Sequence, residues 1–337
     1  MKWYNYLFIF IILILLAIFL LTRKEKKEFG FFETEKYKPE QQLISANLKD
    51  VDYISLEKKE LKSVLIKKDN NWFLEKNNNK KLFPIDETKI ENLINELNSI
   101  KIDKVASTKA EKFGKFALTD TEAFRLIMKN GDKNILEFLI GENNESFTGT
   151  YVRFVNDNYT LLTDRRLTSA IINAKEEFWL NKRIIDEVNI NDVMTITLKA
   201  DEDTKYNLSI KRENKESDTF YLSYDDTRII VLRDDINNNL INRLSNLTAA
   251  AFAEDFDTNI FNKVNFECSI NFKDGKNYSF IIGNQTPDNQ NYYIKNIAKE
   301  YVYLLNKNNV YMLFFDNDIV KKIKVKTNQT KNKTKVK

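Results

Sequence analysis

The sequence predicts an α+β protein: an N-terminal transmembrane helix, then two tandem copies of a unit built from antiparallel strands, a helix and further antiparallel strands. Three observations predict this fold class. Residues 7–21 contain no polar or charged side chain. The rest of the chain resembles itself at a spacing of about 142 residues. Within each copy, short runs rich in Val, Ile, Leu, Tyr and Phe flank a segment whose apolar residues have helical spacing.

The N-terminal segment has the length and the flanks of a membrane anchor. Residues 3–22 would span about 30 Å as a helix, which is the thickness of a bilayer's hydrocarbon core. Trp3 and Tyr6 lie at one end and Arg23 at the other, as suits the two membrane interfaces. A small-x-small cleavage pattern and a lipobox Cys are both missing, which favours an uncleaved anchor over a signal peptide. We therefore expect the lipid bilayer to be the partner of residues 3–22.

Two signals compete over the side of the membrane on which the body lies. Positive charge is denser after the apolar segment, which by the positive-inside rule favours the cytoplasm. Glu25 and Glu28 reduce the net positive charge after the segment, and Lys2 and the amino terminus add positive charge before it. In addition, long domains can be translocated regardless of flanking charge. We expect a single-pass protein of the bacterial inner membrane whose body is extracytoplasmic.

The net charge of +4 hides an uneven distribution. Five basic residues lie in residues 1–28 and eight in residues 321–337, and these two ends hold only two acidic residues. Of the 53 basic and 49 acidic residues, 40 and 47 remain between the ends, where the net charge is near −7. An acidic body argues against nucleic acid as a partner, whereas basic ends suit anionic lipid headgroups.

The body has the pattern of a tandem repeat. The matches are colinear, and their spacing drifts by only a few residues, which short loop insertions would absorb; chance similarity between strands of biased composition is the alternative. We expect an anchor and basic flank at 1–28, a stalk at 29–48, repeat units at 49–185 and 186–320, and a disordered basic tail at 321–337. The matched pairs are Val51–Leu56 with Val193–Leu198, Trp72–Leu74 with Phe220–Leu222, Leu93–Leu97 with Leu240–Leu244, Gly141 with Gly283, Tyr151 with Tyr293, and Leu162 with Leu304.

In the first unit, an amphipathic helix is expected after the first strands. Residues 90–97 place apolar side chains at i, i+3, i+4 and i+7, and Asp86 is a suitable N-cap before them. A second helix is expected over residues 165–178, with Trp179 at the join between the units. The expected strands are 53–57, 63–68, 72–75, 124–128, 135–140, 151–155 and 159–163.

The second unit repeats this order. Asp235 precedes residues 236–244, whose apolar side chains again have helical spacing. A turn at Asp274-Gly275 separates two alternating runs. The expected strands are 195–199, 206–212, 219–223, 228–232, 268–272, 278–282, 292–294 and 301–305.

Composition excludes several classes of enzyme. The chain has no His, which excludes Ser-His-Asp and Cys-His catalysis and imidazole zinc sites. Its one Cys, Cys268, allows no internal disulfide and no CxxC metal site. Because Cys268 alternates with Ile270 and Phe272, we interpret it as a small buried hydrophobic residue. No glycine-rich phosphate-binding motif occurs, and we expect no cofactor.

Two short motifs resemble reactive sites without meeting their requirements. Ser55-Leu56-Glu57-Lys58 matches Ser-x-x-Lys, but it lies in an expected strand, where residues i and i+3 face opposite sides. The segment Asp255–Asn259 starts like a calcium loop, but Ile260 and Phe266 stand where Gly and Glu are required. We expect no catalytic, cofactor-binding or metal-binding residue.

Acidic clusters and tryptophans leave two alternatives open. Clusters at 201–203, 225–226 and 234–235 are interpreted as turns and caps, although a pair of carboxylates could serve a glycosidase. Trp72 and Trp179 are expected in the core, with a sugar-binding platform as the alternative.

Six short motifs occur in the order found in a known bacterial family. They are Trp72-Phe73-Leu74, Pro84 with Asp86, Phe113-Gly114 with Leu118, Leu139-Ile140-Gly141, Tyr151-Val152-Arg153 and Trp179-Leu180-Asn181-Lys182. The chain thereby resembles the domain-of-unknown-function 4340 proteins, well over residues 50–185 and loosely in the second copy. It departs from the family pattern within residues 113–118, where Gly and Leu are separated, and at Asn181, where Arg is common.

The resemblance implies a role rather than an activity. Family members are typically anchored by one N-terminal helix and are often encoded beside ABC-type permease subunits, including those linked to gliding motility. No activity is established for the family, so it implies no catalytic residue. We expect a non-catalytic accessory or scaffold protein of an ABC-type export complex, with transporter subunits as partners. An envelope glycan- or lipid-binding module and, less favoured, a carboxylate-dependent hydrolase are the alternatives.

Overall fold

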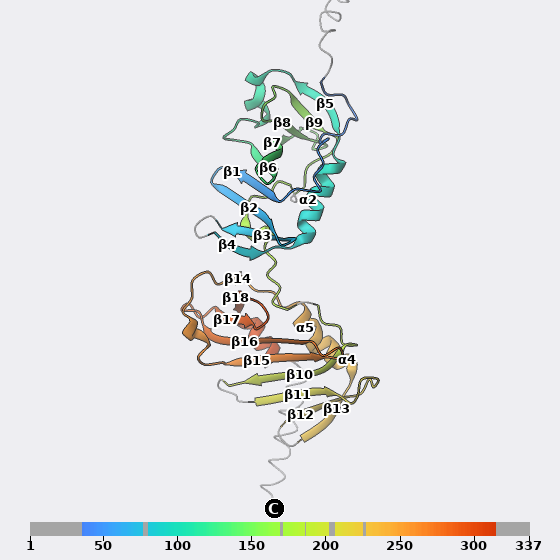
Figure 1. Cartoon of the computed structure of the whole chain (residues 1–337), viewed down its shortest axis with the longest axis vertical. Helices are drawn as coiled ribbons and strands as arrows, with labels where there is room; N and C mark the ends of the chain where they lie inside the picture. The colour runs from blue at the N-terminus through green and yellow to red at the C-terminus, as the bar shows by residue number, and fades with distance from the viewer. Residues whose placement is uncertain are drawn as a thin grey trace, which may run out of the picture. The chain divides into compact units, whose positions relative to one another are not determined.

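The computed structural model describes residues 36–76, 80–168, 171–185, 187–201, 206–224 and 227–314 (Figure 1). These residues form two compact units. The first unit contains the described residues up to Lys81 and Asp86–Trp179, and the second contains Leu82–Ile85 and the described residues from Leu180 onward. The predicted membrane-spanning residues 3–22 and the predicted tail at 321–337 lie outside the described residues.

The first sheet has nine strands in the order β4-β3-β2-β1-β6-β7-β8-β9-β5. Every pair whose register is defined is antiparallel. Most neighbours are consecutive in the chain, but β1 pairs with β6 and β9 with β5. The strands are β1 (Tyr53–Lys58), β2 (Leu61–Lys68), β3 (Asn71–Lys76), β4 (Lys81–Pro84), β5 (Ile102–Ser107), β6 (Phe124–Asn130), β7 (Lys133–Asn143), β8 (Thr150–Phe154) and β9 (Thr160–Thr163).

The second sheet has the same topology, with the order β13-β12-β11-β10-β15-β16-β17-β18-β14. Its strand pairs are also antiparallel. The strands are β10 (Val193–Ala200), β11 (Tyr206–Arg212), β12 (Phe220–Tyr224), β13 (Thr227–Val231), β14 (Ala251–Phe252), β15 (Phe266–Phe272), β16 (Asn277–Gln285), β17 (Asn291–Asn296) and β18 (Val302–Asn306).

Apolar residues at alternate positions join the central strands of each sheet. Leu56 of β1 lies opposite Leu126 of β6, and Leu198 of β10 lies opposite Cys268 of β15. All four side chains are buried. Because side chains alternate between the two faces of a strand, such pairs line one face and build a continuous core there.

One helix covers the core face of the first unit. Helix α2 (Glu87–Ser99) begins at its N-cap Asp86, whose carboxylate accepts a hydrogen bond from the Thr88 amide. This cap is the one that the sequence predicts, and it satisfies a backbone donor that the first helical turn leaves unpaired. Ile90, Leu93 and Leu97 are buried beneath the helix.

The corresponding helix of the second unit is interrupted. It consists of α4 (Arg233–Ile236), a π-helical turn η2 (Asn237–Ile241) and α5 (Asn242–Ser245). Asp235, expected before the helix, lies inside its first turn. The π-helical turn accommodates one extra residue, and Ile236, Leu240 and Leu244 remain buried.

A short helical segment presses onto a glycine in each unit. The 3₁₀ helix η1 (Ala110–Phe116) lies against Gly141, where an added Cβ would stand 2.0 Å from the carbonyl oxygen of Phe116. The 3₁₀ helix η3 (Thr258–Phe261) lies against Gly283, where it would stand 2.3 Å from the carbonyl oxygen of Ile260. Both glycines lie within a register shift of a long strand, so the aligned glycines have the same structural role.

The N-terminal end of the described chain is fixed to the first unit. Tyr37 stacks on Phe154 with ring centroids 6.0 Å apart, and its hydroxyl donates to Asp157 over 2.6 Å. Lys36 pairs with the same carboxylate at 2.5 Å. Burial alone would raise the pKa of Asp157, but the hydrogen bonds from Lys36 and Tyr37 outweigh it and hold this pKa below its ordinary value.

The predicted α+β fold class is wrong. The described residues form two large antiparallel sheets with few helices, of which the longest, α2, has 13 residues. Strands before and after the helix in the sequence join one sheet, because β1 pairs with β6 and β10 pairs with β15. The helix therefore covers a face of that sheet instead of separating two sets of strands.

The helix predicted over residues 165–178 is also wrong: in the described parts of this range, 165–168 and 171–178, the single turn α3 (Glu176–Trp179) is the only helix that forms. A side chain occupies a backbone group that a helix would use: the Ala174 carbonyl accepts from the Ser63 hydroxyl over 2.9 Å. The Leu167 amide, which would be unpaired in the first turn of such a helix, donates to the Thr150 hydroxyl over 3.0 Å. In the second unit a helix, α6 (Lys307–Phe314), follows β18.

No helix within the part of the chain that the structure describes is long and apolar enough to cross a membrane.

Candidate interaction surface of the second unit

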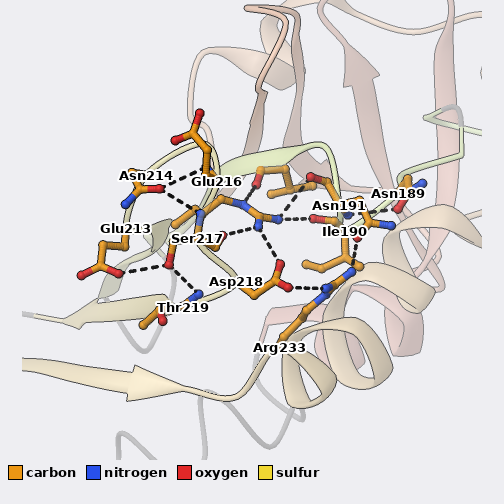
Figure 2. Close-up of polar contacts among 12 residues, drawn as sticks. Asn189, Ile190, Asn191, Glu213, Asn214, Glu216, Ser217, Asp218, Thr219 and Arg233 are labelled. Carbon is orange, nitrogen blue, oxygen red and sulfur yellow. Dashed lines mark hydrogen bonds and ion pairs between the residues drawn. The ribbon is translucent and has the colours of Figure 1, made fainter.

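Two loops of the second unit, whose residues Figure 2 labels, converge on the buried Arg212. The loop Asn189–Asp192 leads into β10, and the hairpin loop Glu213–Thr219 connects β11 to β12. Arg212, the last residue of β11, lies between them and is 1% exposed. Leu208, Ile210 and Arg212 alternate along β11 and are all buried, so the strand's own alternation turns the arginine inward.

The guanidinium of Arg212 uses its full donor capacity. Nε donates to the Val193 carbonyl over 2.8 Å, and Nη2 donates to the carbonyls of Ile190 and Asn191 over 2.6 and 3.3 Å. Nη1 donates to the Ser217 carbonyl over 2.6 Å and to the Asp218 carboxylate over 3.2 Å. A guanidinium has five N–H donors, so none remains for a bound anion.

Asp218 joins this arginine to a second one at the surface. Its other carboxylate oxygen lies 3.0 Å from Nη1 of Arg233, and Arg233 also donates to the Asn191 side chain. Asp218 is 69% exposed and Arg233 31% exposed. The carboxylate is thus shared by two cations and fixes the start of α4 to the hairpin loop.

The hairpin loop is held in one conformation by its own side chains. The Asn214 side-chain oxygen accepts from the amides of Glu216 and Ser217 over 3.0 and 2.8 Å. The Ser217 hydroxyl donates to Glu213 over 3.0 Å and accepts from the Thr219 amide over 3.0 Å. Figure 2 shows these contacts side by side. An exposed charged loop held in this way would lose little conformational entropy on binding a partner.

A shallow cavity of about 240 Å³ borders the loop Asn189–Asp192. Phe272 and Tyr278 provide its apolar wall, with their rings in an edge-to-face contact at 5.1 Å. The backbone hydrogen bonds of the Asp274 turn lower the pKa of the Asp274 carboxyl, and its contact with Lys276 raises the pKa of that lysine. The lining residues are Glu187, Asn189, Asp192, Phe272, Lys273, Asp274, Lys276 and Tyr278.

The first unit has its own buried arginine, at a different strand. Arg153 of β8 is 7% exposed and donates to the carbonyls of Leu118 and Val155 over 3.0 and 3.1 Å. It also donates to Asp120 over 3.1 Å and lies 4.2 Å above the Phe113 ring. Arg153 therefore holds η1 and the turn after it against β8.

The Ser-x-x-Lys motif lies in a strand, as expected. Ser55 is buried in β1 and its hydroxyl donates to Glu57 over 2.8 Å. Glu57 pairs with Lys62 of the neighbouring strand over 2.8 Å, and Lys58 is exposed at the end of β1. The lysine is therefore not placed to activate the serine.

The segment resembling a calcium loop forms a helix cap. Asp257 is the N-cap of η3, and its carboxylate accepts from the Asn259 amide over 2.9 Å. Within the described ranges, no group of three or more acidic or thiol side chains is arranged to hold a metal ion.

Trp72, Trp179 and Cys268 lie in the core. Trp72 is 7% exposed and Trp179 is fully buried, with its indole N–H donating to the Asn173 carbonyl over 3.1 Å. Buried rings cannot form a sugar-binding platform. Cys268 is fully buried, and burial raises the pKa of its thiol.

Comparison with known proteins gives one match. The family model described as "Domain of unknown function (DUF4340)" matches residues 72–263, more than half of the chain. The match runs from β3 of the first sheet into the second unit and includes Arg212. No curated protein and no solved structure matches the chain.

Proposed function

The chain belongs to the DUF4340 family, and on that premise we propose that it is a non-catalytic accessory or scaffold protein of an ABC-type export complex. In this proposal, residues 3–22 anchor it in the bacterial inner membrane and the two units lie outside the cytoplasm. The proposal rests partly on the membrane and transporter association that the family resemblance implies.

The structural observation that carries the proposal is the filled donor set of Arg212. A buried arginine at a catalytic or anion-binding site needs a donor free for its ligand. All N–H donors of the Arg212 guanidinium are hydrogen-bonded to backbone carbonyls of the two loops, to the Val193 carbonyl or to Asp218. Its contribution is therefore to fix two exposed loops, which suits a surface that contacts another protein.

The test is co-purification with the transporter subunits. The hairpin loop offers an exposed Lys-Glu pair, Lys215-Glu216, whose side chains take no part in the hydrogen bonds that hold the loop. The double variant K215E/E216K keeps the net charge and should reduce recovery of a permease subunit at least tenfold from detergent extracts. The matched control is K59E/E60K in the exposed β1–β2 turn, which should leave recovery unchanged. Recovery of no transporter subunit by the unaltered chain would refute the proposal.

The side of the membrane is tested by labelling. Lys215→Cys introduces an exposed thiol, whereas native Cys268 is buried and unreactive. A membrane-impermeant maleimide should label the variant in intact cells, after permeabilisation of the outer membrane where one is present. Labelling only after lysis would place the body in the cytoplasm.

The cavity beside Phe272 and Tyr278 favours a second candidate, an envelope glycan- or lipid-binding module. Glycan-array binding that is lost in Tyr278→Ala, together with unchanged transporter recovery, would favour this candidate over the scaffold.

A further inference from the structure

The loop between β7 and β8 of the first unit displays an aromatic side chain on an unfavourable backbone conformation. Phe147 is 65% exposed, and its φ of 56° lies in the left-handed region. A bulky side chain crowds its own backbone there, so residues other than Gly, Asn and Asp rarely adopt this conformation. Among the described non-glycine residues with positive φ, Phe147 is the only aromatic one. The fold therefore accepts a local cost at a side chain that it hardly buries.

The loop's own hydrogen bonds hold this conformation. The Asn144 side-chain oxygen accepts from the amides of Thr148 and Gly149 over 2.8 and 3.1 Å, and the Phe147 amide donates to the Asn144 carbonyl over 2.9 Å. At the base of the loop, a Cβ added to Gly149 would stand 2.3 Å from the Thr163 carbonyl oxygen, so the loop lies tightly against β9. The backbone that carries Phe147 would thus lose little conformational entropy on binding a partner.

The second unit contains the same turn with a different residue at its tip. Thr286 and Asn289 align with Asn144 and Phe147 at the repeat spacing of 142. Asn289 has a φ of 58°, and its amide donates to the Thr286 carbonyl over 2.8 Å. Asparagine tolerates the left-handed region because its short polar side chain can form local hydrogen bonds. Since the same turn forms with a better suited residue, the turn itself does not explain Phe147, and backbone strain of this kind is concentrated at binding sites.

The chemistry of the loop tip favours a protein over a lipid surface as the partner of Phe147. Residues 144–148 read Asn-Glu-Ser-Phe-Thr, with one apolar and one acidic side chain. Segments that insert into a bilayer interface combine several apolar residues with cations that attract anionic headgroups, and this loop has neither. A single aromatic ring surrounded by polar groups is instead typical of an interface residue that fills a pocket on another protein.

The charges of the loop and of the body favour a basic partner. Glu145 is exposed, and among the described residues no hydrogen bond or ion pair holds its carboxylate. A basic side chain at the border of the partner's pocket would complement this charge. Residues 29–320 have a net charge near −7, so a second copy of the same acidic body would be repelled.

We propose that Phe147 is the apolar anchor of a contact between the first unit and a different protein. The partner presents an apolar pocket that receives the ring, with a basic side chain beside Glu145. This contact goes beyond the proposed function, because it involves the first unit and not the hairpin loop Glu213–Thr219, and because it does not require the partner to be a transporter subunit.

Stability measurements separate a binding role of Phe147 from a packing role. Phe147→Asn introduces the residue that the second unit has in this turn, so the urea midpoint of the full chain in detergent should stay the same or rise. Asn289→Phe should lower the midpoint. A lower midpoint for Phe147→Asn would show that the ring stabilises its own unit and would overturn the proposal. An unchanged midpoint for Asn289→Phe would also overturn it, because phenylalanine would then carry no cost in this turn.

Photo-cross-linking in intact cells identifies the partner. The full chain with benzoylphenylalanine at position 147 should cross-link to one protein, through a peptide that contains apolar residues and at least one Lys or Arg. Benzoylphenylalanine at position 289, in the equivalent turn, is the matched control and should give about tenfold less product or lower. Equal yields at the two positions, products with lipid alone, products with a second copy of this chain, or no product at 147 would each overturn the proposal.

Charge exchange tests the basic side chain of the partner. Glu145→Lys should lower the cross-linking yield at position 147 about tenfold or more, and replacing the cross-linked partner's basic residue with Glu should restore it. Glu60→Lys, in the exposed β1–β2 turn, is the control and should leave the yield unchanged. An unchanged yield in Glu145→Lys would overturn the assignment of a basic partner. A charge-dependent cross-link to another protein, with no transporter subunit recovered in co-purification, would refute the proposed function while supporting this contact.

Discussion

Arg212 shows how one side chain can fix two loops. Buried charge is costly unless it is fully hydrogen-bonded, and here five acceptors surround the guanidinium, which also lies 4.4 Å above the Phe220 ring. Most of these acceptors are backbone carbonyls of residues 190–193 and of Ser217. Without the arginine, those carbonyls would need water molecules as hydrogen-bond donors.

Arg212→Met keeps the length of the side chain and removes its donors. We expect the free energy of unfolding to fall by about 3 kcal/mol, because several hydrogen bonds to a charged group are lost together. Urea denaturation measures this change. Arg228→Met is the control: Arg228 is exposed and stacks on Tyr221, so its loss should cost less than about 1 kcal/mol. Equal effects would show that burial of Arg212 contributes little.

Asp157 gives the first unit a defined dependence on pH. Its pKa is lowered in the folded chain, so its contribution to stability is present above the unfolded pKa of about 4 and is lost as pH falls through the folded value. We expect Asp157→Asn to be less stable than the unaltered chain at pH 7, and we expect this difference to shrink as the pH falls below the unfolded pKa and through the lowered folded pKa of Asp157. Denaturation midpoints across pH check this, with the exposed Glu60→Gln as control. A difference that persists unchanged into acid would contradict it.

At the residue scale, the sequence predicts burial better than it predicts polar partners. Cys268 alternates with apolar neighbours, and its burial follows from that pattern. The same alternation in β11 places Arg212 inward, which is a readable signal that our sequence interpretation missed. Its acceptors come from residues 190–193 and 217–218, and only the tertiary fold brings these loops together.

At the scale of elements, the repeated contact between a 3₁₀ helix and a strand glycine leaves no room for a side chain. Gly141→Ala and Gly283→Ala each bring a methyl group into a backbone carbonyl oxygen. We expect each to lower the free energy of unfolding by about 3 kcal/mol. Gly114 has no atom nearer than 4.0 Å to an added Cβ, so Gly114→Ala should change stability by less than about 1 kcal/mol. Thermal or urea denaturation of the three variants tests this order, and a tolerated Gly283→Ala would contradict it.

The sequence predicts a helix or strand correctly where the local residue pattern and the tertiary contacts favour the same structure. Residues 90–97 have helical spacing and the Asp86 cap, and α2 forms there. Residues 165–178 carry apolar side chains, but Ser63 binds the Ala174 carbonyl and Thr150 fixes the Leu167 amide outside a helix. Those partners lie far away in sequence, so no local sequence pattern predicts these hydrogen bonds. The sequence does not predict β4, β5 and β14, because β4 and β14 are short and β5 has little apolar alternation.

At the scale of the whole chain, two sheets of the same order each have a separate core. We expect Arg212→Met to increase hydrogen exchange in β10, β11 and β12 while amides in β1 and β6 keep their protection, because distant sites without shared partners act independently. Mass spectrometry of deuterated peptides measures the exchange of amides in both units from one sample. Equal loss of protection in both units would show that they unfold together.

The shared strand order also has a consequence during synthesis. Strands of one copy resemble those of the other, so a nascent chain could pair β1 with β15 in place of β6. Ribosomes add about 5–20 residues per second, so the 142 residues separating the copies take roughly seven to thirty seconds to emerge. Antiparallel domains generally fold in milliseconds to seconds. The first sheet can therefore close before its competitor exists, and the order of translation protects the correct pairing.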